Sequence, residues 1–342
     1  MSTRGTFASY LEGGAHVLNF PQPPKSYGQV FLEDTDRPLP QKLNQSTRYA
    51  MFSTIAKGGK SLIKSCKDLH LGRIVCYKTL RPEFADDEIE QRRFLREARV
   101  SAMLQHPNTV PTYELGRDNQ GHYYFTMKLV HGYTLREVLE YRERYDLTQL
   151  IDVIVQVGHA LEYAHTHGVA HRDIKPENIL VGPYGEVLLL DWGLAKVWNP
   201  DGTALKDDEV EAVTTSVLSN RNKNLALTAR GKLQGTISYM SPEQIERDPG
   251  IDQRTDIYSL GAVLYEVLCG ETPSKGETMD EIVKSTLHDT PPRPAEVTSM
   301  RIPALLEETC MRCINKDPDA RVADMMEMVR LLQEDWRSDL FG

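Results

Sequence analysis

Two short polar segments of the sequence carry the residues best suited to chemistry. The stretch His171-Arg172-Asp173-Ile174-Lys175-Pro176-Glu177-Asn178 combines a base, two cations and an amide within eight residues. Thirteen residues after Asn178 comes Asp191-Trp192-Gly193, which follows the apolar run 187–190. An aspartate at a strand end, followed by glycine, can present its carboxylate to a metal ion in a tight turn. Both patterns at this spacing are too specific to arise by chance, so we interpret them as parts of one site.

These segments resemble the catalytic loop and the metal-binding loop of Hanks-type, eukaryotic-like protein kinases. The resemblance implies that Asp173 accepts or orients the proton of a substrate hydroxyl and that Lys175 steadies the γ-phosphate of ATP. It also implies that Asn178 and Asp191 hold Mg²⁺, with Mn²⁺ as an alternative. Phosphoryl transfer offers a protein little covalent chemistry, so catalysis rests on position and on cations that neutralise developing charge. A lysine at position 175 matches the serine/threonine branch of the family.

A lysine and a glutamate upstream fit the same resemblance. Val75-Cys76-Tyr77-Lys78 is similar to the strand motif that ends in the ATP-anchoring lysine, with Cys76 in place of the usual alanine beneath the adenine. Glu97 lies in a helix predicted over 86–105 and is the natural ion-pair partner of Lys78. Alone, Glu97 would be one of several solvated helix charges. Together with Lys78 and the downstream motifs, the functional interpretation is favoured.

The glycine-rich loop departs from the family pattern. GxGxxGxV falls on Ala56-Lys57-Gly58-Gly59-Lys60-Ser61-Leu62-Ile63, so Ala56 and Ser61 replace two of the three glycines. The resemblance assigns nucleotide contacts to five of these residues: Ala56, Lys57, Gly58, Gly59 and Ile63. Gly58 still permits close backbone approach to phosphates, whereas Ser61 adds a Cβ, so we expect weakened but not abolished ATP binding. Lys60 could reach the phosphates, although a solvated surface lysine is the commoner case. Without its context, a Gly-Gly pair is typical of an ordinary hairpin turn.

The segment Met127-Lys128-Leu129-Val130 corresponds by resemblance to the part of the fold that closes the adenine pocket. Met127 takes the gatekeeper position, and backbone groups of 128–130, including those of Lys128 and Val130, would hydrogen-bond the adenine. The simpler interpretation, an ordinary strand and linker, is compatible with this one.

Two further segments resemble the end of the family's activation segment. They are Gly235-Thr236 and Ser241-Pro242-Glu243, with Ser241 in place of the usual alanine. By resemblance, Thr236 would hydrogen-bond Asp173 and Lys175.

Buried charges should support these segments. The resemblance implies that Asp256 holds the backbone of the 171–178 segment. It also implies that Arg321 pairs with Glu243 as a buried bidentate bridge.

Four residues have a regulatory meaning in the family. Arg172 would be a buried cation without a partner until a phosphorylated residue docks on it. Thr228, eight residues before Thr236, lies where bacterial members commonly carry an activating phosphothreonine, and Thr214 and Thr215 are second choices. The alternative is that all three are unmodified polar loop residues.

The composition narrows the class of protein. The 342 residues are 40% hydrophobic and 26% charged, which excludes a mostly disordered, collagenous or membrane-spanning chain. A net charge of −9 argues against binding nucleic acid or an anionic membrane through overall charge. The start of the chain lacks the order of a signal peptide, and the five scattered cysteines indicate reduced thiols in a cytoplasm. Only Cys310 and Cys313 form a CxxC pair, which we interpret as core packing on a helix rather than a metal site.

The elements that position these residues change along the chain. Residues 1–48 contain five prolines and read as an irregular extension. Short β-like runs then predict an antiparallel meander, and strong helical periodicity follows over 148–168, 255–269, 303–314 and 322–335. We therefore expect an α+β fold: the bilobal protein kinase fold over 49–336, with a tail at 337–342. Its N-lobe (49–130) would be a small antiparallel sheet with one main helix, and its C-lobe (131–336) larger and helical.

By resemblance, the chain should transfer the γ-phosphate of ATP to serine or threonine hydroxyls of proteins, beginning with its own activation segment. The eroded glycine loop leaves open a pseudokinase, or a regulatory module that binds nucleotide or a partner. A small-molecule phosphotransferase is disfavoured, because Ser241-Pro242-Glu243 and the long segment 197–233 usually build a peptide-docking surface. We expect a protein substrate, no membrane segment in this chain, and a homodimer that would serve trans-autophosphorylation.

Overall fold

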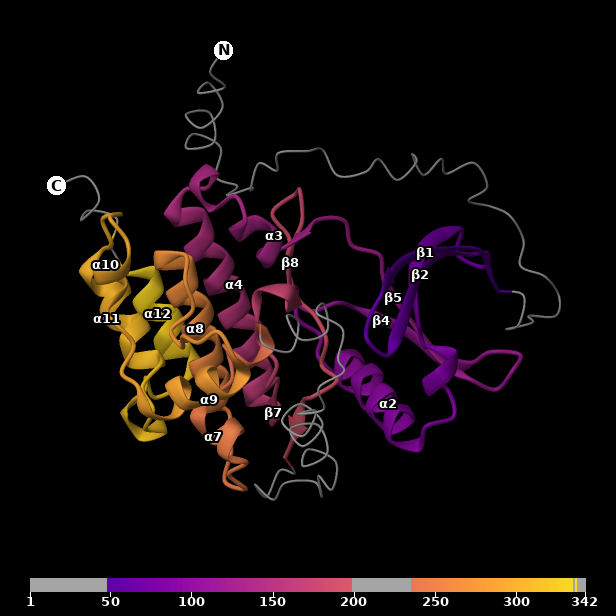
Figure 1. The fold of residues 1–342 in the computed structure, drawn as a ribbon. Helices are drawn as coiled ribbons and strands as arrows, with labels where there is room; N and C mark the ends of the chain where they lie inside the picture. The colour runs from indigo at the N-terminus through magenta and orange to yellow at the C-terminus, as the bar shows by residue number, and fades with distance from the viewer. Residues whose placement is uncertain (1–47, 199–234, 335, 337–342) are drawn as a thin grey trace, which may run out of the picture. The chain divides into compact units, whose positions relative to one another are not determined.

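The computed structural model describes residues 48–198, 235–334 and 336, and these fall into two units (Figure 1). We call them the N-terminal unit, which ends at His131, and the C-terminal unit, which begins at Gly132. The first is built on an antiparallel sheet and the second mostly on helices, so the predicted α+β class is confirmed.

A five-stranded antiparallel sheet forms the N-terminal unit, in the order β1-β2-β3-β5-β4. The meander predicted from the sequence is present as β1 (Tyr49–Lys57), β2 (Ser61–Asp68) and β3 (Arg73–Leu80). β5 (Tyr123–Lys128) pairs with β3, and β4 (Thr112–Arg117) pairs with β5 at the edge. Aromatic and β-branched residues favour this pleated arrangement.

One long helix, α2 (Glu88–Met103), packs against the sheet (Figure 1). Asp87 caps its N-terminus by accepting two backbone N–H bonds. Phe94 and Ala98 lie four residues apart on one helix face and are buried against the sheet, where the Phe94 ring lies 5.0 Å from that of Phe125. This apolar contact fixes which face of α2, and so which of its carboxylates, meets the sheet.

The C-terminal unit is organised around α4 (Leu147–Thr166) and α8 (Arg254–Cys269). Most residues of α8 are buried, as expected for a helix surrounded by others. α11 (Ala304–Cys313) packs on α8, and α12 (Met325–Gln333) packs on α4. At Gly270, which has a φ of 84°, the chain leaves α8 in the left-handed conformation that favours glycine.

Short strands bracket the two segments singled out in the sequence. β7 (Val169–Ala170) precedes residue 171 and pairs with β10 (Lys196–Val197). β8 (Ile179–Val181) follows residue 178 and lies between β6 (Tyr133–Thr134) and β9 (Val187–Leu189). Hydrogen-bonded strands therefore precede and follow each of the two segments, 171–178 and 191–193.

The other helices of the described residues are shorter. They are α3 (Leu135–Leu139), α7 (Pro242–Glu246), α9 (Met279–His288), α10 (Pro294–Val297) and the 3₁₀ turns η2 (Pro82–Phe84), η3 (Arg142–Arg144), η4 (Pro176–Asn178) and η5 (Pro318–Ala320). Among the described residues, none of the helices combines the length and apolar character needed to cross a membrane.

The CxxC pair lies in the core, as predicted. Cys310 and Cys313 are both fully buried on α11. A Cβ built on Gly261 of α8 would lie 2.6 Å from the Cys313 Cβ, so the two helices are in close contact there. Burial raises the pKa of the Cys313 thiol to about 12, which keeps it protonated and a poor metal ligand at neutral pH.

Candidate functional site

In the 171–178 loop, the carboxylate of Asp173 accepts hydrogen bonds from two neighbouring side chains, those of Lys175 and Asn178. Lys175 donates from Nζ to both carboxylate oxygens of Asp173 at 2.8 Å, and also to Thr236 Oγ1 at 3.1 Å. Asn178 donates from Nδ2 to Asp173 Oδ2 at 2.9 Å and to the Asp173 carbonyl at 2.8 Å. The predicted bond between Thr236 and Lys175 is therefore present, and Asp173 lies at the centre of a polar network.

The surroundings of Asp173 act on its acidity in opposite directions. Burial raises the pKa of the Asp173 carboxyl, the charge of Lys175 lowers it, and the charge of Asp191 raises it again; burial prevails, so the pKa lies above its ordinary value. Because Asp191 raises this pKa, the two carboxylates repel each other across the site. A cation between them would relieve that repulsion.

Asp256 anchors the backbone of the loop, as predicted. This fully buried carboxylate on α8 accepts the backbone N–H of His171 and of Arg172, each at 2.8 Å. His165 of α4 lies 2.8 Å away through Nε2. The backbone at Arg172 is in the left-handed region, with a φ of 66°. The two charge-assisted bonds hold the chain in this unfavourable conformation.

The prediction that Arg172 lacks a partner is wrong. Its side chain is buried, and Nε donates to the backbone carbonyl of Leu194 at 2.8 Å. The Arg172 carbonyl in turn accepts Nε2 of Gln244 at 2.8 Å. Thr214, Thr215 and Thr228 lie outside the described residues.

The Asp191 carboxylate is presented at the surface of its loop. Asp191 is exposed, has a φ of 64° and accepts the N–H of Gly193 at Oδ1, 3.3 Å away. The next residue, Trp192, is buried with its ring 4.6 Å from that of His171. His171 Nε2 lies 2.9 Å from the Leu190 carbonyl. These contacts fix the loop around Asp191 against the 171–178 loop.

Asn178 and Asp191 are chemically suited to a hard divalent cation. The amide nitrogen of Asn178 is directed at Asp173, which leaves Oδ1 as the atom that this side chain can offer to a metal. Asp191 adds an exposed carboxylate. Oxygen ligands of these two kinds are what Mg²⁺ prefers, and the repulsion between Asp173 and Asp191 gives a cation an electrostatic reason to bind.

The N-terminal unit contains the predicted lysine–glutamate pair. Lys78 Nζ on β3 lies 2.5 Å from Glu97 Oε1 on α2, and both side chains are about nine-tenths buried. A buried pair of this kind fixes the lysine against the helix. Cys76 is buried two residues away and lies opposite Met127 in the sheet. Lys128 is exposed and donates its backbone N–H to the Pro111 carbonyl at 3.0 Å.

Residues Gly58–Ser61 form the connection between β1 and β2, which we call the β1–β2 turn. Gly58 donates its N–H to the Ser61 carbonyl at 2.9 Å, and Ala56 lies opposite Ile63 in the hairpin. A Cβ at Gly58 would lie only 2.8 Å from Ser61 Oγ. The Ser61 hydroxyl therefore lies where a side chain at position 58 would have to be, so glycine is the residue that fits at position 58. Lys57 and Gly59 are exposed.

Lys60 is an exposed surface lysine, as expected, but its side chain also has an ion-pair partner. Its Nζ lies 2.5 Å from Glu90 Oε1 on α2. Glu90 precedes Glu97 by seven residues, two helical turns, so the sequence carried a signal for a second carboxylate on the same helix face. That signal does not name the partner.

The predicted bridge between Arg321 and Glu243 is present and bidentate. Arg321 donates from Nη1 and Nη2 to the two oxygens of Glu243 at 2.7 and 2.8 Å.

A second network of charged side chains was not predicted from the sequence. Glu266, buried on α8, accepts Nη1 of Arg136 and the hydroxyl of Tyr239, each at 2.5 Å. No short motif marks this network, because its members come from three distant segments.

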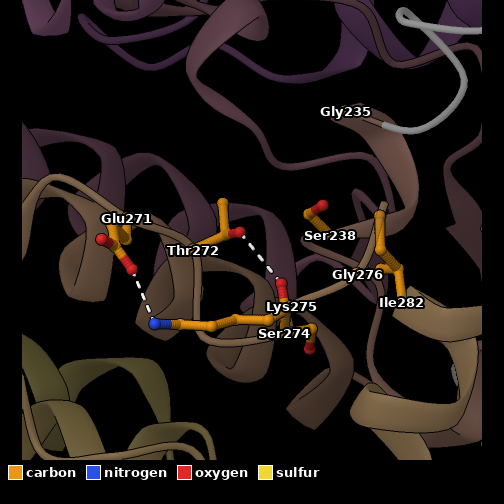
Figure 2. Close-up of a pocket in the computed structure, with 8 residues that line it drawn as sticks. All are labelled: Gly235, Ser238, Glu271, Thr272, Ser274, Lys275, Gly276 and Ile282. Carbon is orange, nitrogen blue, oxygen red and sulfur yellow. Dashed lines mark hydrogen bonds and ion pairs between the residues drawn. The ribbon is translucent and has the colours of Figure 1, made fainter. Parts of the chain in front are cut away.

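A pocket of about 390 Å³ lies in the C-terminal unit beside the residue that precedes Thr236 (Figure 2). Its rim carries an ion pair between Lys275 and Glu271, 2.7 Å apart, and a bond of 3.1 Å from the Thr272 hydroxyl to the Ser274 carbonyl. Its lining is mostly small or polar: Gly235, Ser238, Glu271, Thr272, Ser274, Lys275, Gly276 and Ile282. None of these residues was predicted to contact nucleotide.

Comparison with known proteins identifies the family. Residues 49–337 match the model of the family described as protein kinase domain. The chain belongs to this family. The kinase-domain match covers both units, and with it the resemblance inferred from the two polar segments is confirmed.

Three curated proteins from bacteria are similar to this chain. The serine/threonine-protein kinase PknD of Protochlamydia amoebophila is 32% identical over 312 residues, 87% of this chain and 31% of that protein. PknD of Chlamydia pneumoniae is 34% identical over 307 residues, 86% of this chain and 31% of that protein. A probable serine/threonine-protein kinase of Clostridium acetobutylicum is 32% identical over 284 residues, 83% of this chain and 39% of that protein. The chain thus spans about a third of the length of these relatives.

Proposed function

We propose that the chain is an ATP-dependent serine/threonine protein kinase that also phosphorylates itself. The observation that carries the proposal is the network around Asp173, in which Lys175 and Asn178 hold the carboxylate and Thr236 contacts Lys175. A pseudokinase has no need to keep a carboxylate, a lysine and an amide in this mutual geometry. The relatives' names support the same activity.

Each residue then has a definite task. Asp173 orients the serine or threonine hydroxyl and accepts its proton, and Lys175 keeps the carboxylate in place from 2.8 Å. Lys78, fixed by Glu97, anchors the phosphates of ATP. Asn178 and Asp191 supply oxygen ligands to Mg²⁺ or Mn²⁺. The bound cation offsets the negative charge of the transferred phosphoryl group.

Several features support the remaining parts of the proposal. The pocket beside Gly235 lies next to Thr236, where a segment of a protein substrate could bind. All five cysteines are free thiols, as is usual for a protein of the reducing cytoplasm. Self-phosphorylation at Thr228, Thr214 or Thr215 in trans would bring two copies of the chain together as a homodimer.

The test is the intact mass of dephosphorylated protein before and after incubation with Mg²⁺ and ATP, beside an Asp173→Asn variant. Added phosphate on the wild type alone, on serine or threonine, supports the proposal. If the wild type gains no mass while ATP still raises its melting temperature, and a panel of protein substrates also remains unmodified, the chain is a nucleotide-binding pseudokinase. If neither mass nor melting temperature changes, it is a binding module that does not use ATP.

A further inference from the structure

The β1–β2 turn is held to the rest of the N-terminal unit at three places. The backbone N–H of Arg81 donates to the Lys60 carbonyl at 2.9 Å, and Arg81 Nη1 donates to the Gly59 carbonyl at 3.1 Å. The third contact, from Lys60 Nζ to Glu90 at 2.5 Å, is the one that reaches α2. Arg81 therefore ties the turn to the end of β3, while Lys60 ties it to the helix.

Glu90 is an unusual partner for a lysine at the tip of a hairpin. Its side chain is only 10% exposed, although Lys60 is 45% exposed. Arg93, one helical turn further on and itself mostly buried, donates from Nη1 to the same carboxylate oxygen at 2.7 Å. Glu90 thus has a buried cation of its own and keeps a compensated charge whether or not Lys60 is present.

The two lysine–glutamate pairs of the unit share one helix. Glu97 meets Lys78 from β3, and Glu90, two turns earlier, meets Lys60 from the turn. Residues seven apart lie nearly one above the other on a helix. A rotation or shift of α2 would therefore act on both lysines together.

We propose that Lys60 and Glu90 form a strut that sets the position of the β1–β2 turn for nucleotide phosphates and couples it to α2. Lys60 is thus a positioning residue, and the strut restrains a turn in which Ala56 and Ser61 stand where the family pattern has glycines. The proposal rests on nucleotide binding by this site, as in the proposed function, but not on phosphoryl transfer.

The first measurement is hydrogen exchange of the turn amides in the full, nucleotide-free chain. Lys60→Met should speed exchange over Gly58–Ser61, because the turn loses its ion pair with Glu90 on α2. Lys64→Met is the matched control: it removes a lysine from the same hairpin that lies over the Phe52 ring, 5.7 Å away. The Lys64→Met variant should exchange like the wild type. Equal exchange in Lys60→Met and Lys64→Met would overturn the strut.

The second measurement is the affinity for Mg²⁺-ATP by direct titration in the Asp173→Asn background, where turnover is removed. Lys60→Met and Glu90→Gln should each weaken binding about 3- to 10-fold, and Lys60→Arg should retain the affinity. The double variant should be no weaker than either single one, because both remove the same contact.

A direct contact between Lys60 and the phosphates predicts a different pattern. Glu90→Gln would then release Lys60 and leave the affinity unchanged or tighter, and nucleotide-free exchange would not respond to Lys60→Met. Either result would overturn the proposal. If Glu90→Gln misfolds because Arg93 loses its partner, the exchange of Lys60→Met decides alone. A wild type that binds ATP without transferring phosphate would defeat the proposed function and leave the strut standing.

Discussion

The 171–178 loop and the β1–β2 turn are held in contrasting ways. The loop is fixed from the inside, because the buried Asp256 accepts two of its backbone N–H groups. The turn is held by side chains that are 38% exposed at Arg81 and 45% exposed at Lys60. The loop keeps the family pattern, whereas the turn has lost two of its glycines. A loop fixed by buried hydrogen bonds tolerates few substitutions. A turn held by exposed side chains tolerates more, and an ion pair such as that of Lys60 with Glu90 can restrain it instead.

The largest expected effect is at Asp173. Asp173→Asn should lower phosphoryl transfer about 10²- to 10⁴-fold, because the amide cannot accept the proton of the substrate hydroxyl. ATP should still raise the melting temperature of the variant. The measurement is phosphate incorporation per molecule over time. An Asp173→Asn variant as active as the wild type would mean that the 171–178 loop tolerates substitution as readily as the β1–β2 turn.

A stability effect should follow at Asp256. Asp256→Asn removes one acceptor oxygen and the negative charge from buried backbone donors, and should lower the free energy of unfolding by about 2–4 kcal/mol. Urea denaturation measures this loss. Asp252→Asn, at a partly exposed site paired with Arg254, is the control and should cost less than about 1 kcal/mol. Equal losses of unfolding free energy in Asp256→Asn and Asp252→Asn would mean that the buried carboxylate stabilises the fold no more than the partly exposed one.

At acidic pH, the stabilisation that the Asp256 carboxylate provides should be lost. Burial alone would raise the pKa of Asp256, but the hydrogen bond and charge of His165, with further contributions from His171 and the Arg172 N–H, hold it below its ordinary value. The stabilisation is therefore fully present above the unfolded pKa of about 4 and is lost as the pH falls through the lower folded pKa. The difference in unfolding free energy between wild type and Asp256→Asn should stay constant from pH 7 to 5 and shrink below about pH 4. A difference that widens in acid would contradict this assignment.

The smallest effect is expected in the β1–β2 turn. Ser61→Gly removes the hydroxyl that lies beside Gly58 and restores the glycine of the family pattern, and it should tighten ATP binding about 2-fold. Titration with Mg²⁺-ATP measures the change, and Ser65→Gly further along β2 serves as control. Weaker binding by the Ser61 variant would mean that the hydroxyl is itself a phosphate ligand.

Much of the fold could be predicted because hydrophobic periodicity marks buried faces. The helix expected over 86–105 is α2 (Glu88–Met103), and the one expected over 255–269 is α8 (Arg254–Cys269). Their ends moved by one or two residues because capping, at Asp87 for example, decides where a helix begins.

The pairs between charged side chains were partly predictable. Lys78 with Glu97, and Arg321 with Glu243, came from motifs in which each residue type has a known partner. The partner of Arg172 is a backbone carbonyl, at Leu194, which has no sequence signature. Lys60 with Glu90 depends on the reach of a side chain between two elements. Lys60 falls on an unspecified position of the glycine-loop pattern, and no motif assigns a partner to Glu90.

Four described non-glycine residues have a positive φ, and two of them, Arg172 and Asp191, lie in the two loops assigned to chemistry. Such a conformation costs about 1–3 kcal/mol for an ordinary side chain. Glycine at position 191 would relieve that cost and would also remove the carboxylate assigned to the metal. Selection for thermal stability alone should therefore favour glycine at position 191, and the resulting protein would lack the carboxylate assigned to the metal. At position 191, the requirement for a metal ligand and the requirement for conformational stability favour different residues.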